Sequence, residues 1–120
     1  MQENTQLQRA DFDLAQRVCQ YLIDHIDQKI TTAELSARFG VSQTRIKTSF
    51  RSWYGTSIHA YIRQRRMEEA ARLLEESSDS VLEIAGRVGY ENGSKFSSAF
   101  RAQMGMTPSQ YRRTAEPRRE

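Results

Sequence analysis

One pattern of residue types occurs twice in this sequence. The first copy has an acid, a glycine, a Phe-Arg pair, a second glycine, a tyrosine and an arginine: Glu34, Gly40, Phe50-Arg51, Gly55, Tyr61 and Arg63. The second copy repeats these types as Glu83, Gly89, Phe100-Arg101, Gly105, Tyr111 and Arg113. The offset is 49 residues from Glu34 to Glu83 and 50 from Tyr61 to Tyr111, so the copies differ by one inserted residue. Such a repeat predicts two equal modules, which suit a target that itself repeats.

The local pattern predicts helices throughout. Apolar residues recur at intervals of three and four, and no stretch alternates as a half-buried strand would. Thr31-x-x-Glu34 and Ser80-x-x-Glu83 each have the form of a capping box at a helix start. Gly40 suits the end of a helix and Ser42 the start of the next, and helix, short glycine turn, helix is the helix-turn-helix pattern. In that next helix, Ile46, Ser49, Phe50 and Trp53 share the face predicted to be buried.

This organisation predicts an all-α fold with seven helices, arranged as two helix-turn-helix subdomains joined by a long central helix. Residues 1–10 are polar and unpatterned, which indicates a flexible lead. The linking helix has an expected length of about 30 Å, close to one turn of DNA at about 34 Å. The predicted ranges are a domain over 11–115, a first helix-turn-helix over 31–54, a linker helix over 57–76, a second helix-turn-helix over 80–105, and a tail over 116–120.

Charge is segregated along the chain. From Leu35 to Met67 there are seven basic residues and no acid, and from Ser94 to Ala115 there are four basic residues and no acid. The acids gather in residues 1–34, which hold six, and in residues 68–91, which hold seven. A solvated mixed-charge surface would intersperse the two signs. Basic residues confined to the second half of each repeat therefore indicate a binder of polyanions.

Several classes of protein are disfavoured. The single cysteine, Cys19, excludes an internal disulfide and fits a reducing cytoplasm. No apolar run approaches the roughly twenty residues that a membrane span requires. The two histidines, His25 and His59, stand on different predicted helices without ligands at metal-binding spacing, so we expect no metal, no cofactor and no enzymatic activity.

The second copy contains the most distinctive motifs. Residues 84–90 read Ile-Ala-Gly-Arg-Val-Gly-Tyr, residues 95–101 read Lys-Phe-Ser-Ser-Ala-Phe-Arg, and residues 105–112 read Gly-Met-Thr-Pro-Ser-Gln-Tyr-Arg. From about Asp11 to Thr114 the chain resembles the DNA-binding domain of the AraC/XylS family of bacterial transcription regulators. The resemblance implies two helix-turn-helix units whose recognition helices face successive major grooves on one side of DNA.

The resemblance also implies which side chains read bases. They fall on the start and middle of the third and sixth helices. Arginine and lysine can donate to guanine O6 and N7, whereas serine and threonine contact several bases with less discrimination. Many family members have an arginine just before the apolar-Phe pair, where this chain has Thr48 and Ser98, so we expect the first unit to read sequence more sharply. The predicted base contacts are Thr44, Arg45, Lys47, Thr48, Ser94, Lys95, Ser97 and Ser98.

Phosphate contacts are predicted for Ser42, Arg51, Arg63 and Arg101. Such contacts position a protein on the duplex without reading its sequence. Arg51 and Arg101 each lie one residue after a predicted core phenylalanine, and Arg63 lies on the linking helix. Ser42 lies at a helix start, where backbone amides favour anions. The alternative for the arginines is that they are ordinary solvated charges.

These observations predict a sequence-specific double-stranded DNA-binding transcription regulator in the bacterial cytoplasm, associated with the nucleoid. The resemblance further implies an activator, for which RNA polymerase is a candidate partner, and a domain that is itself monomeric. The alternative is a basic helical adaptor that binds an acidic protein partner or RNA. Acid-free faces and the lack of an aromatic platform for RNA bases argue against this alternative.

Overall fold

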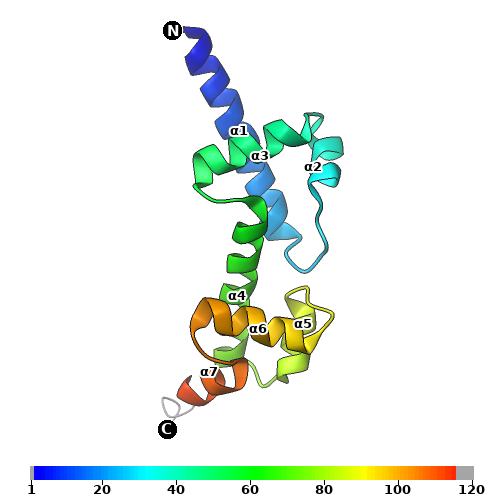
Figure 1. Cartoon of the computed structure of the whole chain (residues 1–120), viewed down its shortest axis with the longest axis vertical. Coiled ribbons are helices and arrows are strands. Elements are labelled where there is room, and N and C mark those ends of the chain that lie inside the picture. The colour runs from blue at the N-terminus through cyan, green and yellow to red at the C-terminus, as the bar shows by residue number, and fades with distance from the viewer. Residues whose placement is uncertain (1, 116–120) are drawn as a thin grey trace. The chain divides into compact units, whose positions relative to one another are not determined.

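The computed structural model describes residues 2–115, with side chains from residue 7 onward. Within this range the backbone forms seven α-helices and no strand (Figure 1), which confirms the predicted all-α fold. Residue 1 and the predicted tail over 116–120 lie outside the described residues. The helices are α1 (Gln2–Asp24), α2 (Thr32–Phe39), α3 (Gln43–Tyr54), α4 (Ile58–Glu76), α5 (Val81–Arg87), α6 (Gly93–Met104) and α7 (Pro108–Ala115).

The helices group into two compact units, each with one helix-turn-helix. Among the described residues, the first unit consists of the chain up to His25 together with Lys29–Ile62. The second unit consists of Ile26–Gln28 and the chain from Arg63 onward. The division falls within α4, the long helix that connects the two modules. The first helix-turn-helix is formed by α2 and α3, and the second by α5 and α6.

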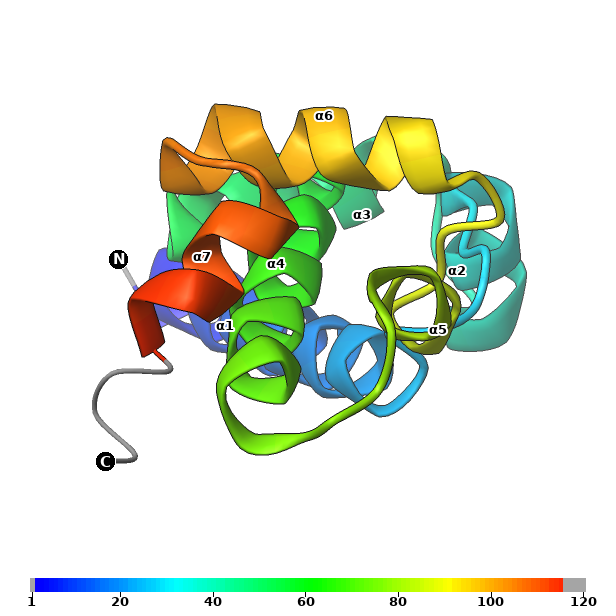
Figure 2. The ribbon, with the colours of Figure 1, turned by 90° about the horizontal axis from the view of Figure 1, so that it is seen from below.

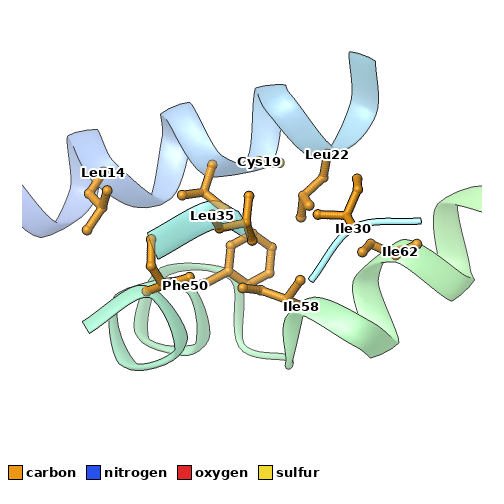
Figure 3. Close-up of a cluster of buried hydrophobic side chains, with 10 residues drawn as sticks. Leu14, Cys19, Leu22, Ile30, Leu35, Phe50, Ile58 and Ile62 are labelled. Atoms are coloured by element: carbon orange, nitrogen blue, oxygen red, sulfur yellow. The ribbon is translucent and has the colours of Figure 1, made fainter. Parts of the chain in front are cut away.

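The first unit has its own apolar core. Figure 3 shows side chains from α1, α2, α3 and the start of α4 meeting in one cluster. Phe50 and Leu35 are fully buried, and Cys19 is a buried core thiol that donates to the Tyr61 hydroxyl at 3.1 Å. Trp53 differs from the prediction: it lies at the edge of the unit, 44% exposed, with its ring 4.9 Å from that of Phe12 on α1. The buried cluster is Leu14, Val18, Cys19, Leu22, Ile30, Leu35, Ile46, Phe50, Ile58 and Ile62.

A second, separate core lies in the second unit. There α5, α6 and α7 pack around the C-terminal half of α4 (Figure 2). Phe100 is fully buried in this core as Phe50 is in the first, and the two stand at matching positions of the sequence repeat. The buried cluster is Met67, Ala70, Ala71, Leu73, Leu74, Ile84, Ala85, Val88, Phe96 and Phe100.

The first helix begins earlier than the sequence pattern predicts. We predicted order from about Asp11, whereas α1 begins at Gln2. Residues 2–10 are mostly Glu, Gln, Leu, Arg and Ala, which are good helix formers, and they include no glycine or proline. Because adding residues to an existing helix is easier than nucleating one, the buried part of α1 is enough to extend helical backbone into this polar stretch.

The two predicted capping boxes differ in the structure. At the start of α5, Ser80 Oγ accepts from the Glu83 amide and Glu83 Oε1 accepts from the Ser80 amide, both at 3.0 Å. At the start of α2, Thr31 Oγ1 accepts from the Glu34 amide at 3.1 Å. The Glu34 carboxylate instead accepts from the Tyr21 hydroxyl of α1 at 2.9 Å. The second box is therefore complete, and half of the first is replaced by a link between α1 and α2.

Arg66 of α4 is a structural arginine. Its Nε donates to the Ile26 carbonyl and its Nη2 to the Gln28 carbonyl, each at 2.8 Å. Its guanidinium carbon lies 5.7 Å from the centre of the Tyr90 ring. Burial lowers the pKa of Arg66 from its usual value, and nearby Tyr90 and Asp27 act in the opposite direction. With its donors engaged by carbonyl groups, Arg66 holds the 26–28 segment to the second unit.

Gly89 leaves room for this arginine. It has a left-handed backbone with φ of 93°, and a Cβ built there would lie 3.0 Å from Arg66 Cζ. We expect Gly89→Ala to lower the free energy of unfolding by about 1 to 3 kcal/mol, because the left-handed conformation is strained for alanine and Arg66 must move. Gly86 in α5 is the matched control, since a Cβ there meets nothing within 4 Å.

Gly86→Ala should stabilise the protein by about 0.5 to 1 kcal/mol, because alanine loses less backbone entropy than glycine in a helix. Urea denaturation followed by circular dichroism measures both changes. Equal effects of the two substitutions would contradict the role assigned to Gly89.

Candidate nucleic-acid interface

The exposed face of α3 holds the predicted base-reading residues of the first unit. Ser42 caps the helix, with its Oγ accepting from the Arg45 amide at 3.1 Å. Ile46, Ser49 and Phe50 are buried on the opposite face and fix the rotation of α3 within its unit. As a result, the side chains between these buried positions face solvent. The exposed residues are Thr44, Arg45, Lys47 and Thr48.

Arg45 has a partner that sequence reasoning missed. Its Nε lies 3.3 Å from Asp11 Oδ1 of α1, and the two side chains remain 44% and 41% exposed. The residues are far apart in the sequence, and no periodicity relates them. The unit thus places an acid beside one of its candidate base contacts.

Thr48 is oriented by its own helix. Its hydroxyl donates to the Thr44 carbonyl oxygen at 2.8 Å. Because the hydroxyl proton is used there, the side chain offers outward only acceptor lone pairs and a methyl group. These groups suit the amino group of adenine or cytosine and the methyl group of thymine, and they cannot donate to guanine.

The exposed face of α6 is the counterpart in the second unit. Asn92 caps the helix, with its Oδ1 accepting from the amides of Ser94 at 2.8 Å and Lys95 at 3.1 Å. Ser94, Lys95 and Ser98 are exposed, as predicted for base contacts. Ser97 is half-buried, so it has less access to a groove than the other three.

The candidate phosphate contacts are all exposed. Within the described residues, none of Arg51, Arg63 and Arg101 has an acidic group within 4.0 Å, whereas Arg65, Arg72 and Arg87 all do. Ser42 Oγ is occupied in capping α3, which leaves its hydroxyl proton and the first backbone amides of the helix to meet an anion.

Other arginines are engaged within the fold. Arg112 donates to the carbonyls of Leu74 and Ser77, both at 3.2 Å, at the end of α4. Arg38 lies over the Tyr21 ring, 4.5 Å from its centre. Together with Arg66, these residues account for part of the basic charge that the sequence alone assigned to a polyanion. Of the cations that remain exposed, Arg45, Lys47 and Arg51 lie on α3, Lys95 and Arg101 on α6, and Arg63 near the start of α4.

Two further classes of site are absent from the part of the chain that the structure describes. No three His, Cys, Asp or Glu side chains there gather as the ligands of a metal ion would. No helix in the same residues combines the length and apolar character needed to cross a membrane.

Comparison with known proteins gives consistent matches. A family model described as a helix-turn-helix domain matches residues 35–114. The chain is 33% identical over 91 residues to the probable transcriptional regulator LumQ of Photobacterium leiognathi, covering 76% of this chain and 37% of that protein. It is 41% identical over 93 residues to the uncharacterized HTH-type transcriptional regulator YdiP of Escherichia coli, covering 78% of this chain and 31% of that protein. The chain thus spans about a third of the length of these relatives.

A solved structure matches at the level of the fold and the sequence. It is the DNA-binding domain of AdpA, a global transcriptional factor, in complex with a target DNA. The TM-score is 0.82 and the identity 31%, over 88% of this chain and 95% of that one. The match therefore covers both helix-turn-helix units of this chain.

Proposed function

This chain belongs to the AraC/XylS family of helix-turn-helix transcription regulators, and we propose on that premise that it binds double-stranded DNA sequence-specifically. Each unit reads one major groove, the first through α3 and the second through α6. The observation that carries the proposal is the face of α3, where Thr44, Arg45, Lys47 and Thr48 are exposed above a buried opposite face. A groove-reading helix needs this separation of polar and core-facing side chains.

The residue types determine which side chains contact bases and which contact phosphates. Lys47 and Lys95 supply amino groups that reach guanine, whereas Thr48 presents acceptors and a methyl group. Arg51, Arg63 and Arg101 contact phosphates, for which they have exposed guanidinium groups without acidic partners among the described residues. Phosphate contacts fix the register in which the α3 and α6 side chains meet the bases.

Selection of bound sequences from a random pool of duplex DNA tests this function. We expect a motif with two halves about 10 to 10.5 base pairs apart, which is one turn of DNA. The half read by α3 should be more sharply defined than the half read by α6, because α6 presents mainly hydroxyl groups. Enrichment of no sequence, or equal binding to single-stranded RNA, would favour the basic adaptor instead.

Lys47→Ala tests the assignment of a base contact. We expect specific binding to weaken by about 1 to 3 kcal/mol and the preference at one base pair to relax. Lys29→Ala is the matched control, because Lys29 is also exposed and lies outside both recognition helices. Titration of the selected site and of its single-base variants measures both effects. A uniform loss of affinity on every sequence would reassign Lys47 to a phosphate.

The finer parts of the proposal follow the family. The regulator acts as an activator that contacts RNA polymerase at its promoters, and its DNA-binding domain is itself monomeric, not an enzyme, and bound to the nucleoid in the cytoplasm. Transcription in vitro with purified polymerase from a template carrying the selected site gives the readout. Repression of that template would contradict the activator role.

A further inference from the structure

The contact between Asp11 and Arg45 adds little to stability. Both side chains are more than 40% exposed, and the Nε to Oδ1 distance is 3.3 Å. Exposed ion pairs of this kind stabilise a fold only marginally, because water screens the charges and two flexible side chains must be ordered. The contact does, however, orient the guanidinium group of Arg45. This orientation matters because Arg45 is a candidate base contact.

The geometry leaves the useful donors of Arg45 unoccupied. A guanidinium group has five N–H donors, one on Nε and two on each Nη. Asp11 takes the Nε edge, so the two Nη groups still offer the donors that a guanine accepts at O6 and N7. An arginine held along one edge also has fewer orientations to lose when it binds, so less of the contact energy is spent on ordering it.

The backbone that carries Asp11 is fixed against α3. Phe12, the next residue, packs edge-on against Trp53 of α3, with ring centres 4.9 Å apart. Leu14 and Ala15 of α1 are buried close by. The Arg45 backbone is in turn fixed by the cap from Ser42. Both ends of the ion pair therefore start from backbone that is held within one unit.

We propose that Asp11 is a positioning residue for base recognition, which orients the Arg45 guanidinium toward a guanine in the groove entered by α3. This inference rests on the proposed function and adds a residue outside both helix-turn-helix motifs to the determinants of specificity. A second effect has the same origin. A carboxylate close to the duplex repels phosphates, so it penalises binding to any sequence that lacks the matching base pair.

The test combines Arg45 and Asp11 variants with a charge-matched control. Asp13 is an exposed acid on the same helix, so Asp13→Ala removes the same charge without removing the contact to Arg45. Sequence selection on the protein and on Arg45→Ala first identifies the base pair that Arg45 reads. The dissociation constants are then measured for the selected site and for its variant at that base pair, with circular dichroism to verify folding.

Arg45→Ala should reduce discrimination at that base pair by about tenfold or more. Asp11→Ala should reduce it by about threefold at the same base pair and raise the affinity for unrelated DNA. The double variant should discriminate no worse than Arg45→Ala, because the two residues act as one unit. Asp13→Ala should leave discrimination unchanged, and Asp11→Glu should recover part of what Asp11→Ala loses.

Any one of the following outcomes would overturn the inference. Discrimination that persists in Asp11→Ala, or losses that add in the double variant, would show that Asp11 does not act through Arg45. An equal effect of Asp13→Ala would reduce the role of Asp11 to its charge. If Arg45→Ala changes no base preference, the inference fails while the proposed function stands, whereas a protein that selects no sequence loses both.

Discussion

Phe100→Ala should lower the free energy of unfolding of the second unit by about 3 to 5 kcal/mol, because it leaves a cavity in a closely packed core. Phe100 is fully buried and packs with Phe96 and Tyr111, at ring distances of 5.9 and 5.5 Å. A protein gains only about 0.05 to 0.15 kcal/mol of stability per residue. The total free energy of unfolding of a unit this small is therefore little larger than the loss expected for Phe100→Ala. We therefore expect much of the second unit to be unfolded in this variant.

Two spectroscopic probes distinguish the unfolding of the first unit from the unfolding of the second. Trp53 is its only tryptophan and lies in the first unit, so its fluorescence follows that unit, whereas far-ultraviolet circular dichroism follows helices in both. In Phe100→Ala, helicity should be lost at lower urea than the Trp53 signal. In Phe50→Ala, at the matching position of the first core, the Trp53 transition itself should move to lower urea.

Leu82→Ala is the control in the second unit, because Leu82 is 67% exposed and its truncation should change stability by less than about 0.5 kcal/mol. Transitions that coincide for both probes in every variant would contradict separate cores. The two buried clusters share no residue, which is the reason to expect separate behaviour.

The fold could be predicted because its determinants are local. Gly40 ends α2 with φ of 68°, Ser42 and Ser80 cap the helices that follow them, and buried residues recur at helical spacing. The start of α1 could not be predicted in this way. Its polar residues lack an apolar stripe, and helical backbone continues there by propensity and by extension from the packed part.

The candidate site could be predicted from the sequence only in part. The exposed residues of α3 follow from the burial of the opposite face, which periodicity reveals. The roles of individual arginines cannot be predicted from periodicity. Arg66 and Arg112 bind carbonyl groups that are distant in sequence, while Arg51 and Arg101 remain exposed. Asp11 was missed for the same reason: an ion pair between two helices depends on packing that no local pattern encodes.

The affinity for DNA should fall steeply with salt. The structure leaves five exposed cations on the proposed contact surfaces without acidic partners among the described residues: Lys47, Arg51, Arg63, Lys95 and Arg101. A cation that enters the ion atmosphere of the duplex releases counterions, whether it lies on a phosphate, as proposed for Arg51, Arg63 and Arg101, or in a groove, as proposed for Lys47 and Lys95. About five such cations give a slope of log K against log salt near −4.5. Between 50 and 200 mM salt the affinity should then drop on the order of several hundredfold.

Two arginines of α4 provide a matched test of this assignment. Arg63 is exposed, whereas Arg72 is engaged by Glu69 at 2.6 Å and by Glu76 at 2.8 Å. Arg63→Ala should make the slope shallower by about 0.9, because one phosphate contact is lost, and Arg72→Ala should leave it unchanged. Titrations of the selected site over a series of salt concentrations measure the slope. A value shallower than about −2 for the unmodified protein would contradict an affinity dominated by phosphate contacts.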